Sequence, residues 1–396
     1  MRGAVIFSVQ GSGEPEIEWT LPVPADAVLR SLHGTTEAGA EHLGGVVNGV
    51  AQWFSMPMLE QRGQSVGRAG HTAKFFTAEG AVKPDSIANV DYLLLGGIEQ
   101  WVMIRGESAA NPVLILLHGG PGFPETGFFR HFNSALERVF TVVYWEQRGT
   151  GRTFSRTIPE ASMTIERFVA DLDELVDTIC KRLRKKRVAI LGHSWGSALG
   201  TLYAAKFPAK VSVYVGTGQI GDLQASEESS YAFVLAEAER RGNRAAIDQL
   251  RAIGGPPHTA KTLGVQRRWL MRFVGLMRGR SFWQVLGVLR RDPEGSIFNL
   301  PNVMRGAMFT LRTMWQEVSR LNLERSAPVL AMPVFFFLGR HDHQVACETG
   351  AAYFDKLVAP SKQLVWFEES AHMPPFEEPE RFNRLMAELV APLARG

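Results

Sequence analysis

The segment that most constrains the fold is 188–197, VAILGHSWGS, a short apolar run that ends in the pattern Gly-x-Ser-x-Gly. Small residues follow it, before a helix-forming sequence begins at Leu202. This order predicts a strand, a sharp turn and a helix, with the serine held in a strained backbone conformation above the sheet. Gly192 and Gly196 lack the Cβ atoms that would collide where the two arms of the turn nearly meet. Ser194 is therefore the candidate nucleophile.

A bare Gly-x-Ser-x-Gly pattern is a weak signal, so the flanking segments must support it. Residues 112–117 form a continuous apolar run, as expected for a strand buried on both faces, and lead into the loop His-Gly-Gly-Pro-Gly at 118–122. Because Pro121 has no N–H group, Gly120 is the expected backbone donor in this loop. Together with the N–H group of Trp195, it would form a two-donor oxyanion hole for acyl transfer.

Two later apolar runs end in an acid and a histidine. The run at 334–338 leads to Asp342, and the run at 364–367 leads to His372. The resulting chain order of serine, aspartate and histidine is that of the α/β-hydrolases. A serine hydroxyl is a poor nucleophile near pH 7, so His372 must take its proton and later pass one to the leaving group. Asp342 would orient the imidazole and stabilise its charged form.

Three ordered motifs resemble the signatures of the proline iminopeptidase (prolyl aminopeptidase) family of α/β-hydrolases. They are HGGPG at 118–122, YWEQRGTGR at 144–152 and GHSWG at 192–196, and the similarity runs from about residue 88 to the C-terminus. Glu146 stands where the family usually has aspartate, and the tryptophan- and glutamate-rich segment that typically opens the family's cap is not recognisable after Gly216. The resemblance implies a serine hydrolase that cleaves a small amide or peptide with a free N-terminal residue through an acyl-enzyme.

Other functions remain open on the same residues. A carboxylesterase or lactonase would use the same triad, because amides and esters share the first tetrahedral intermediate. Epoxide hydrolases and haloalkane dehalogenases carry an aspartate at the elbow, and the serine at position 194 argues against both. A non-catalytic binding protein on this fold would be expected to have lost a member of the triad, and Ser194, Asp342 and His372 are all present.

Strands that alternate with helices predict an α/β-hydrolase fold with a mostly parallel central sheet. We divide the chain into an N-terminal extension (1–85), a first part of the core (86–217), an inserted helical cap (218–328) and a second part of the core (329–396). Two glycines at 96–97, between two apolar runs, predict an antiparallel pair at the start of the sheet.

Several helices can be placed by their spacing and end signals. Thr164 is the expected N-cap of a helix whose last turn carries the basic run 181–186, which we interpret as a solvated helix end. In the cap, 226–242 and 243–253 are predicted helices. The basic and aromatic segment 266–291 is interpreted as a pair of cap helices with arginines in water, with a pocket-facing or membrane-contacting surface as alternatives.

The N-terminal extension has two interpretations. It could wrap and pack on the core, or its aromatic residues could cover the mouth of the active site or an oligomer interface. The aromatic residues in question lie at 53–56 and at Phe75 and Phe76. The sequence does not decide between the two.

A peptide substrate with a free amine would need a carboxylate to receive it. The candidates in the cap are Glu227, Glu228, Glu237 and Glu317, and no motif favours one of them. These residues are therefore a hypothesis for substrate binding that mutation can test.

The remaining polar residues near the motifs have simpler interpretations. His341 and His343 make a poor zinc site without further ligands, so we expect no metal and no cofactor. We expect His118 and His193 to hold the turns by hydrogen bonds. Arg148 and Arg152 lie in the second motif, and we expect them to tie their loop to backbone carbonyls or to Glu146 of the same motif.

Composition bounds the remaining possibilities. Of the 396 residues, 45% are apolar and 21% charged, as in soluble globular proteins, and the net charge of +3 argues against a nucleic-acid binder. Two cysteines exclude a disulfide framework. We find no secretory signal and no stretch long enough for membrane insertion, and expect a cytoplasmic protein. The expected partner is a small-molecule or short-peptide substrate, and a homo-oligomer stays open.

Overall fold

The computed structural model describes residues 3–9, 17–23, 70–275, 277–281, 284–285, 287–288, 294 and 300–395. The chain separates into two compact units, residues 1–64 and 65–396. In the first unit, β1 (Gly3–Val9) and β2 (Ile17–Val23) pair antiparallel, with Gly3 opposite Val23. The aromatic segment 53–56 lies outside the described residues.

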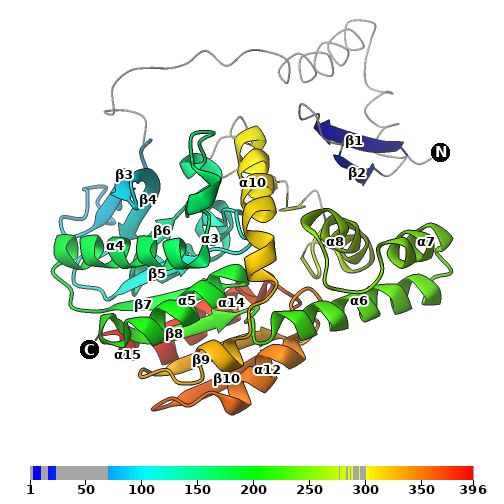
Figure 1. The fold of residues 1–396 in the computed structure, drawn as a ribbon. Coiled ribbons are helices and arrows are strands. Elements are labelled where there is room, and N and C mark those ends of the chain that lie inside the picture. Colours follow the sequence, from blue (N-terminus) through cyan, green and yellow to red (C-terminus); the bar gives the residue numbers. More distant parts are fainter. Residues whose placement is uncertain are drawn as a thin grey trace, which may run out of the picture. The chain divides into compact units, whose positions relative to one another are not determined.

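Among the described residues of the second unit, eight strands form one sheet in the order β10-β9-β8-β7-β5-β6-β4-β3 (Figure 1). Their bounds are Ile87–Leu95 (β3), Ile98–Gly106 (β4), Val113–Leu117 (β5), Thr141–Trp145 (β6), Val188–His193 (β7), Val211–Thr217 (β8), Val334–Gly339 (β9) and Lys362–Phe367 (β10). β4 runs antiparallel to β3 and β6, and all other neighbours are parallel. This confirms the mostly parallel sheet and its antiparallel pair around 96–97.

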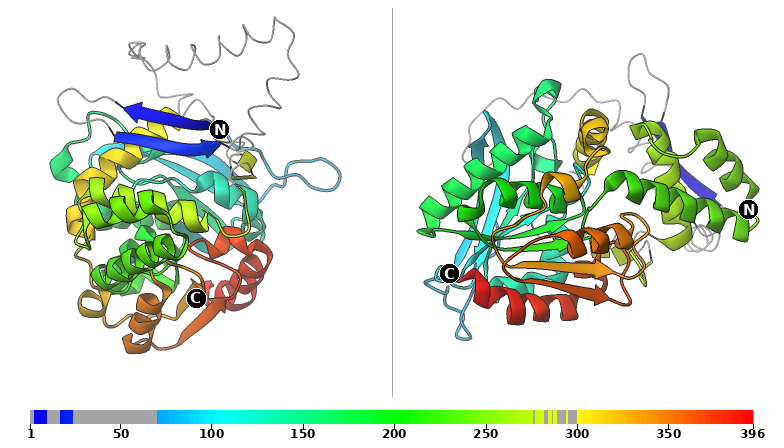
Figure 2. Two further views of the ribbon diagram at one scale, coloured as in Figure 1. Left: turned by 90° about the vertical axis from the view of Figure 1, so that its right-hand side faces the viewer. Right: turned by 60° about the horizontal axis from the view of Figure 1, so that its bottom comes forward.

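Helices cover both faces of the sheet (Figure 2). One face packs against α4 (Ile165–Leu183), α5 (Trp195–Lys206) and α12 (Cys347–Lys356), and the other against α3 (Thr126–Phe132), α13 (Pro374–Glu377), α14 (Pro379–Leu385) and α15 (Ala391–Ala394). Successive strand residues alternate between the two cores, so that Ile190 lies in the first and Leu191 in the second. Burial on both faces is the reason that these strands read as unbroken apolar runs.

The predicted helix after residue 164 is α4, and Thr164 is its N-cap. The Thr164 hydroxyl accepts a hydrogen bond from the backbone N–H of Arg167 at 3.2 Å, which satisfies one of the free N–H groups of the first turn. The helix ends at Leu183, and its C-cap Arg184 has a φ of 54°, in the left-handed region. The basic run therefore spans the last turn of the helix and the turn that follows it.

The elements that the structure describes between β8 and β9 are helices. They are α6 (Leu223–Arg240), α7 (Arg244–Ile253), α8 (Ala260–Val274), α10 (Leu300–Val318) and α11 (Leu323–Ser326). The helices α6, α7 and α8 lie to one side of the sheet and bury a cluster of their own around Val234, Leu250 and Trp269 (Figure 1). α6 and α7 confirm the helices predicted at 226–242 and 243–253. α10 returns to the core, where the Thr310 hydroxyl donates to the Gly149 carbonyl at 3.1 Å.

Residues 70–76 belong to the second unit and contact its sheet. Arg105 donates to the carbonyl of Ala73 at 2.6 Å, and its guanidinium lies 4.6 Å from the centre of the Phe75 ring. Phe76 is 56% exposed. The limits that the sequence suggests for the extension and the cap stay predictions. None of the described helices is long and apolar enough to cross a membrane.

A buried ion pair fastens the second motif to α4. Both Arg148 and Asp171 are fully buried, and the guanidinium donates to the two carboxylate oxygens at 2.8 and 3.0 Å. Arg148 also donates to the carbonyl of Gly96 at 2.9 Å, and Gln100 donates to Asp171 at 2.8 Å. This confirms the expectation that Arg148 ties its loop to a backbone carbonyl.

We predict that Asp171→Ala lowers the free energy of unfolding by about 3–5 kcal/mol, because it leaves the Arg148 charge buried and unpaired. Urea denaturation measures this difference. The control is Glu160→Ala, which removes an exposed ion pair with Arg312 and should change stability little. Equal stability of the Asp171 variant and the wild type would contradict the prediction.

Candidate active site

The turn between β7 and α5 has the strained geometry expected of a nucleophile elbow. Ser194 has φ 54° and ψ −122°, and Arg184 is the only other non-glycine residue with positive φ in the described part of the chain. A Cβ atom on Gly192 would lie 2.3 Å from the carbonyl oxygen of Gly196, and one on Gly196 would lie 2.0 Å from that of Leu117. The first distance confirms the expected collision between the two arms of the turn at Gly192, whereas the side chain excluded at Gly196 would meet the end of β5.

Strand order brings the loop after β5 against this elbow. β5 lies between β6 and β7, with Leu117 opposite Gly192, so both strands deliver their following loops to one crevice at the carboxyl edge of the sheet. A Cβ atom on Gly119 would lie 3.1 Å from the Cβ of Ser194. Gly120 has φ 117°, and a side chain there would meet the backbone nitrogen of Gly122 at 2.5 Å.

Trp195 is the first residue of α5. The N–H groups of a helix's first turn have no partner within the helix and carry its positive dipole end. An N–H group at this position is suited to hold an oxyanion. The assignment of Gly120 and Trp195 to an oxyanion hole stays a prediction.

The structure brings the predicted acid and base into contact. His372 Nδ1 donates to Asp342 Oδ2 at 2.8 Å, and the other carboxylate oxygen accepts the backbone N–H groups of Gln344 and Val345, each at 2.9 Å. Asp342, His372 and Ser194 are 1%, 5% and 6% exposed. These contacts hold the Nδ1 edge of the imidazole and leave its Nε2 atom available to accept a proton.

His372 Nε2 is buried and has no hydrogen-bond partner within the described residues. The structure therefore does not show a hydrogen bond from Ser194 to His372. Catalytic hydrogen bonds in substrate-free enzymes are often long and tighten only in the complex. A different contact brings the two residues near each other. The carbonyl of His372 lies 2.9 Å from the ring Nε2 of His193, and His193 directly precedes Ser194 in the chain.

Two glutamates that the sequence analysis missed hold the His372 loop. Glu377 Oε2 accepts the backbone N–H groups of Ala371 at 2.7 Å and Met373 at 3.2 Å, and Glu378 accepts the Ser370 hydroxyl at 2.6 Å. The other Glu377 oxygen accepts the backbone N–H of Arg278 at 2.6 Å. Burial raises the pKa of Glu377 to about 7. The only sequence signal was a pair of adjacent acids shortly after the predicted base.

The second motif supports the loop at 118–122 by hydrogen bonds. The backbone N–H of Gln147 donates to His118 Nε2 at 3.1 Å, and its side-chain oxygen accepts the Trp195 indole N–H at 2.9 Å. His118 Nδ1 contacts the carbonyl of Gly119 at 2.9 Å, and burial lowers its pKa. Arg152 pairs with Glu146. The expected structural roles of His118 and Arg152 are thus confirmed.

The cap carboxylates have different surroundings. Glu227 is 3% exposed, forms an ion pair with Arg267, and keeps its Oε2 atom buried without a partner in the described part of the chain. Burial raises the pKa of Glu227. Glu228 is exposed and accepts from Gln224 at 3.2 Å.

The other two acids bind groups of the protein itself. Glu237 accepts from Arg240 at 2.7 Å. Glu317 accepts the backbone N–H of Ile165 at 3.0 Å and so caps α4. Glu227 is therefore the cap acid with an unsatisfied buried oxygen.

The remaining predicted features lie around this centre. The ring of His343 stacks on Phe233 at 3.6 Å, and burial lowers the pKa of His343. Among the described residues, no three histidine, cysteine or acidic side chains are grouped as a metal site would require. In the segment 266–291, which is described only in part, Trp269 is buried in the cap cluster. Arg268 donates to Gln249 at 2.7 Å.

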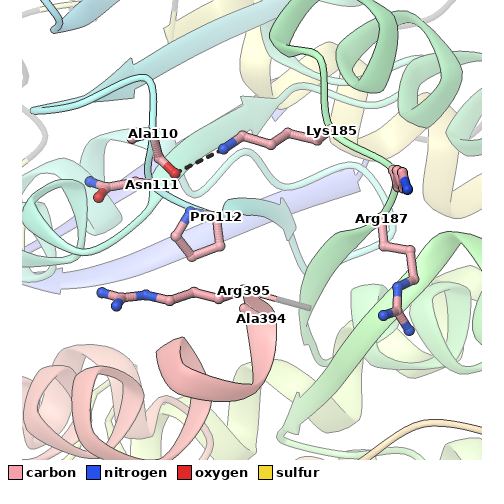
Figure 3. A pocket seen from close by; sticks show the side chains of 8 residues that line it. Ala110, Asn111, Pro112, Lys185, Arg187, Ala394 and Arg395 are labelled. Carbon is pink, nitrogen blue, oxygen red and sulfur yellow. Dashed lines mark hydrogen bonds between the residues drawn. The ribbon is translucent and has the colours of Figure 1, made fainter.

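A separate cavity of about 390 Å³ lies at the opposite edge of the sheet (Figure 3). Its lining includes Pro112, just before β5, and Arg187, just before β7, together with Lys185, which donates to the carbonyl of Ala110 at 2.8 Å. The predicted triad residues follow the carboxyl ends of their strands, whereas this cavity lies at the amino ends. It is therefore distinct from the candidate active site.

Comparison with known proteins agrees with this fold. Residues 112–379 match the family model described as alpha/beta hydrolase fold. The chain is 34% identical over 309 residues to the probable aminopeptidase YbaC of Bacillus subtilis (strain 168), which covers 76% of this chain and 96% of the relative. It is 24% identical over 290 residues to a proline iminopeptidase of Heyndrickxia coagulans, covering 72% of this chain and 92% of the relative.

A solved structure shares the fold. The crystal structure of the proline iminopeptidase of Mycobacterium smegmatis superposes with a TM-score of 0.57 at 21% identity, covering 78% of this chain and 99% of that one. At this identity the likeness concerns the fold alone.

We predict that Gly196→Ala lowers the free energy of unfolding by about 3 kcal/mol, because the added methyl group would overlap the backbone carbonyl of Leu117. Thermal and urea unfolding report the change. Gly255→Ala is the matched control, since its Cβ would meet no atom nearer than Tyr231 at 4.0 Å, and it should unfold like the wild type. A Gly196 variant as stable as that control would show that the elbow is not this tight.

We predict that Glu377 makes stability fall with rising pH. Its pKa is raised in the folded protein to about 7 from an ordinary value of 4.5. The folded state therefore binds this proton more tightly than the unfolded state. The contribution is fully present below pH 4.5 and is lost as the pH rises through 7.

The measurement is the melting temperature of wild type and Glu377→Gln from pH 4 to 8. The melting temperature of the wild type, relative to that of Glu377→Gln, should fall as the pH rises. Glu380→Gln, which changes an exposed acid, should track the wild type at every pH. Parallel curves for wild type and Glu377→Gln would refute the assignment.

Proposed function

This chain belongs to the α/β-hydrolase-fold family, and on that premise we propose that it is a serine hydrolase working through an acyl-enzyme on Ser194. The observation that carries the proposal is the buried Asp342–His372 contact at 2.8 Å, beside a serine held at φ 54°. A strained nucleophile next to an oriented imidazole is the combination that acyl transfer needs.

The reaction follows from the roles of these groups. Ser194 Oγ attacks the substrate carbonyl while His372 Nε2 takes its proton, and the N–H groups of Gly120 and Trp195 hold the oxyanion. Asp342 stabilises the imidazolium, which then gives its proton to the leaving amine or alcohol as the acyl-enzyme forms. A water molecule loses a proton to His372, attacks the ester and releases the acid. The proton returns to Ser194.

The substrate that we favour is a small amide or peptide with a free N-terminal residue. The names of the relatives, probable aminopeptidase and proline iminopeptidase, support this class. The N-terminal part of α6 adds a second support. Ser226 accepts the backbone N–H of Ala346 at 2.9 Å, in the loop that carries Asp342, and the next residue is the buried Glu227. A carboxylate here is suited to receive an ammonium group.

One observation favours a small ester or lactone instead. The Glu227 carboxylate already pairs with Arg267, and Glu228, Glu237 and Glu317 each bind a group of the protein. An ester substrate needs no amine site, and the triad acts on either carbonyl. The two substrate classes therefore differ in their dependence on Glu227.

We predict that Ser194→Ala lowers turnover of every substrate by about 10⁴-fold or more, because no other nucleophile replaces the hydroxyl. The measurement is release of p-nitroaniline from proline p-nitroanilide and of p-nitrophenol from p-nitrophenyl acetate. Undiminished turnover in a folded Ser194→Ala protein would refute the triad.

The same two substrates test the amine site. Glu227→Gln should lower kcat/KM for the anilide by about 10–100-fold, the value of a lost charged hydrogen bond, and leave the ester unchanged. Glu239→Gln, an exposed acid further along α6, is the control and should change neither. Turnover of the ester alone by the wild type would establish the esterase alternative.

A further inference from the structure

Two buried histidines flank the candidate nucleophile and its oxyanion loop, and their hydrogen bonds differ. His193 contacts an oxygen atom with each ring nitrogen, Glu125 Oε1 with Nδ1 at 2.6 Å and the carbonyl of His372 with Nε2 at 2.9 Å. The carbonyl oxygen is an acceptor, and so is the Glu125 carboxylate in its ionised form, whereas a neutral imidazole has a single N–H to donate. Beside an ionised Glu125, either neutral form of His193 would point a lone pair at one of these oxygens. Only the imidazolium then satisfies both contacts.

His118 shows the opposite pattern. Its Nδ1 contacts the carbonyl of Gly119 at 2.9 Å, and its Nε2 accepts the backbone N–H of Gln147 at 3.1 Å. One donor and one acceptor are what a neutral imidazole provides. The two rings thus form a matched pair of buried histidines whose charge states are set by their partners.

The surroundings of His193 allow it to be charged. Glu125 is 2% exposed and supplies a carboxylate in direct contact, while Asp342 supplies a second negative charge nearby. The other groups that face it are the ring of His372, at 4.8 Å between centres, the ring of Phe376, at 6.2 Å, and neutral His118. Burial alone would lower the pKa of His193, but the two carboxylates and the hydrogen bonds raise it.

We propose that Glu125 and His193 form a buried charged pair that positions His372 against Ser194. The inference rests on the triad proposed above. His193 is bonded covalently to Ser194, and its side chain holds the main chain of His372, so the pair links the nucleophile to the base directly. Glu125 and His193 are positioning residues, since neither touches the reacting atoms.

The same pair also lies against the oxyanion loop. A Cβ atom on Gly119 would lie 3.0 Å from Glu125 Oε1 and 3.3 Å from His193 Nδ1, as well as 3.1 Å from the Cβ of Ser194. The loop, the elbow and the base therefore share one support. Movement of that support would change the relative placement of all three.

Glu125→Gln tests the link with little change of shape. A neutral carboxamide cannot balance the charge, so His193 loses a proton and keeps a single N–H, which goes to the carbonyl of His372. The charged hydrogen bond at Nδ1 is then replaced by a weaker neutral one from the carboxamide N–H group, and the base is held less firmly against the nucleophile. A displacement of about 1 Å at a reacting group costs on the order of 10²-fold in rate. We expect kcat to fall by about 10–100-fold with KM within about twofold, because the cap is unchanged.

The double variant tests whether the two residues act as one device. His193→Asn also breaks the link, so Glu125→Gln combined with His193→Asn should be about as slow as the slower single variant. Purely independent structural roles would instead multiply the two losses. His71→Asn, which changes an exposed histidine, is the control for kcat and KM.

The charge state is read directly by ¹⁵N NMR of histidine-labelled protein at pH 8, with His118→Asn and His193→Asn used to assign the two rings. We expect both nitrogens of His193 to be protonated and His118 to be neutral. A neutral His193 in the wild type overturns the proposal, and so does a Glu125→Gln enzyme with wild-type kcat.

Failure of the triad would look different. It would show as turnover that survives Ser194→Ala, which overturns the proposed function and with it the positioning role. The charge state of His193, read in the Ser194→Ala protein, does not depend on catalysis. A charged His193 with an unaffected Glu125→Gln kcat would leave the triad standing and remove only the positioning role.

Discussion

The close approach of the elbow to β5 is the constraint on which the site depends. Gly196 passes so near the carbonyl of Leu117 that a methyl group would lie 2.0 Å from it, and Ser194 in the same turn has φ 54°. The strain is sustained because β7 is buried and hydrogen-bonded on both sides, to β5 and β8. The same proximity places the loop after β5 beside the serine, where backbone N–H groups are needed. A tight turn between the buried strand β7 and helix α5 therefore places the candidate nucleophile beside the loop that we propose holds the oxyanion.

Buried charges fasten the loops around this turn. The Arg148–Asp171 pair anchors the second motif to α4. Glu377 accepts backbone N–H groups from the His372 loop and from Arg278. Glu125 contacts the ring of His193, the residue before Ser194. In the Arg148–Asp171 and Glu125–His193 pairs each charge is offset by its partner, so removal of one member leaves the other uncompensated. Glu377 is held instead by backbone N–H groups. Such networks define a single geometry more sharply than apolar contacts do. Loops that carry catalytic groups need that definition, since they lie outside the regular sheet.

We expect the helices inserted between β8 and β9 to decide substrate specificity, whereas the proposed catalytic residues belong to the core. The inserted helices α6, α7 and α8 have their own apolar cluster, while α10 contacts the loop at Gly149. The helices α6 and α10 also contact the core, through Ser226 to the loop that carries Asp342 and through Glu317 to the start of α4. The pairing of Glu227 with Arg267 is the feature on which amide and ester substrates would differ.

The sequence by itself determined the elements whose cause is local. The elbow glycines, the strands buried on both faces and the Thr164 cap were predictable because neighbouring residues specify them through backbone geometry and burial. The contact of Asp342 with His372 was predictable from chain order, since both follow strands of one parallel sheet. Only the tertiary structure decided the partners of Glu125 and Glu377, and the Glu125–His193 contact joins residues 68 positions apart. The physical reason is that strand order, and not sequence distance, sets which loops meet at the carboxyl edge of the sheet.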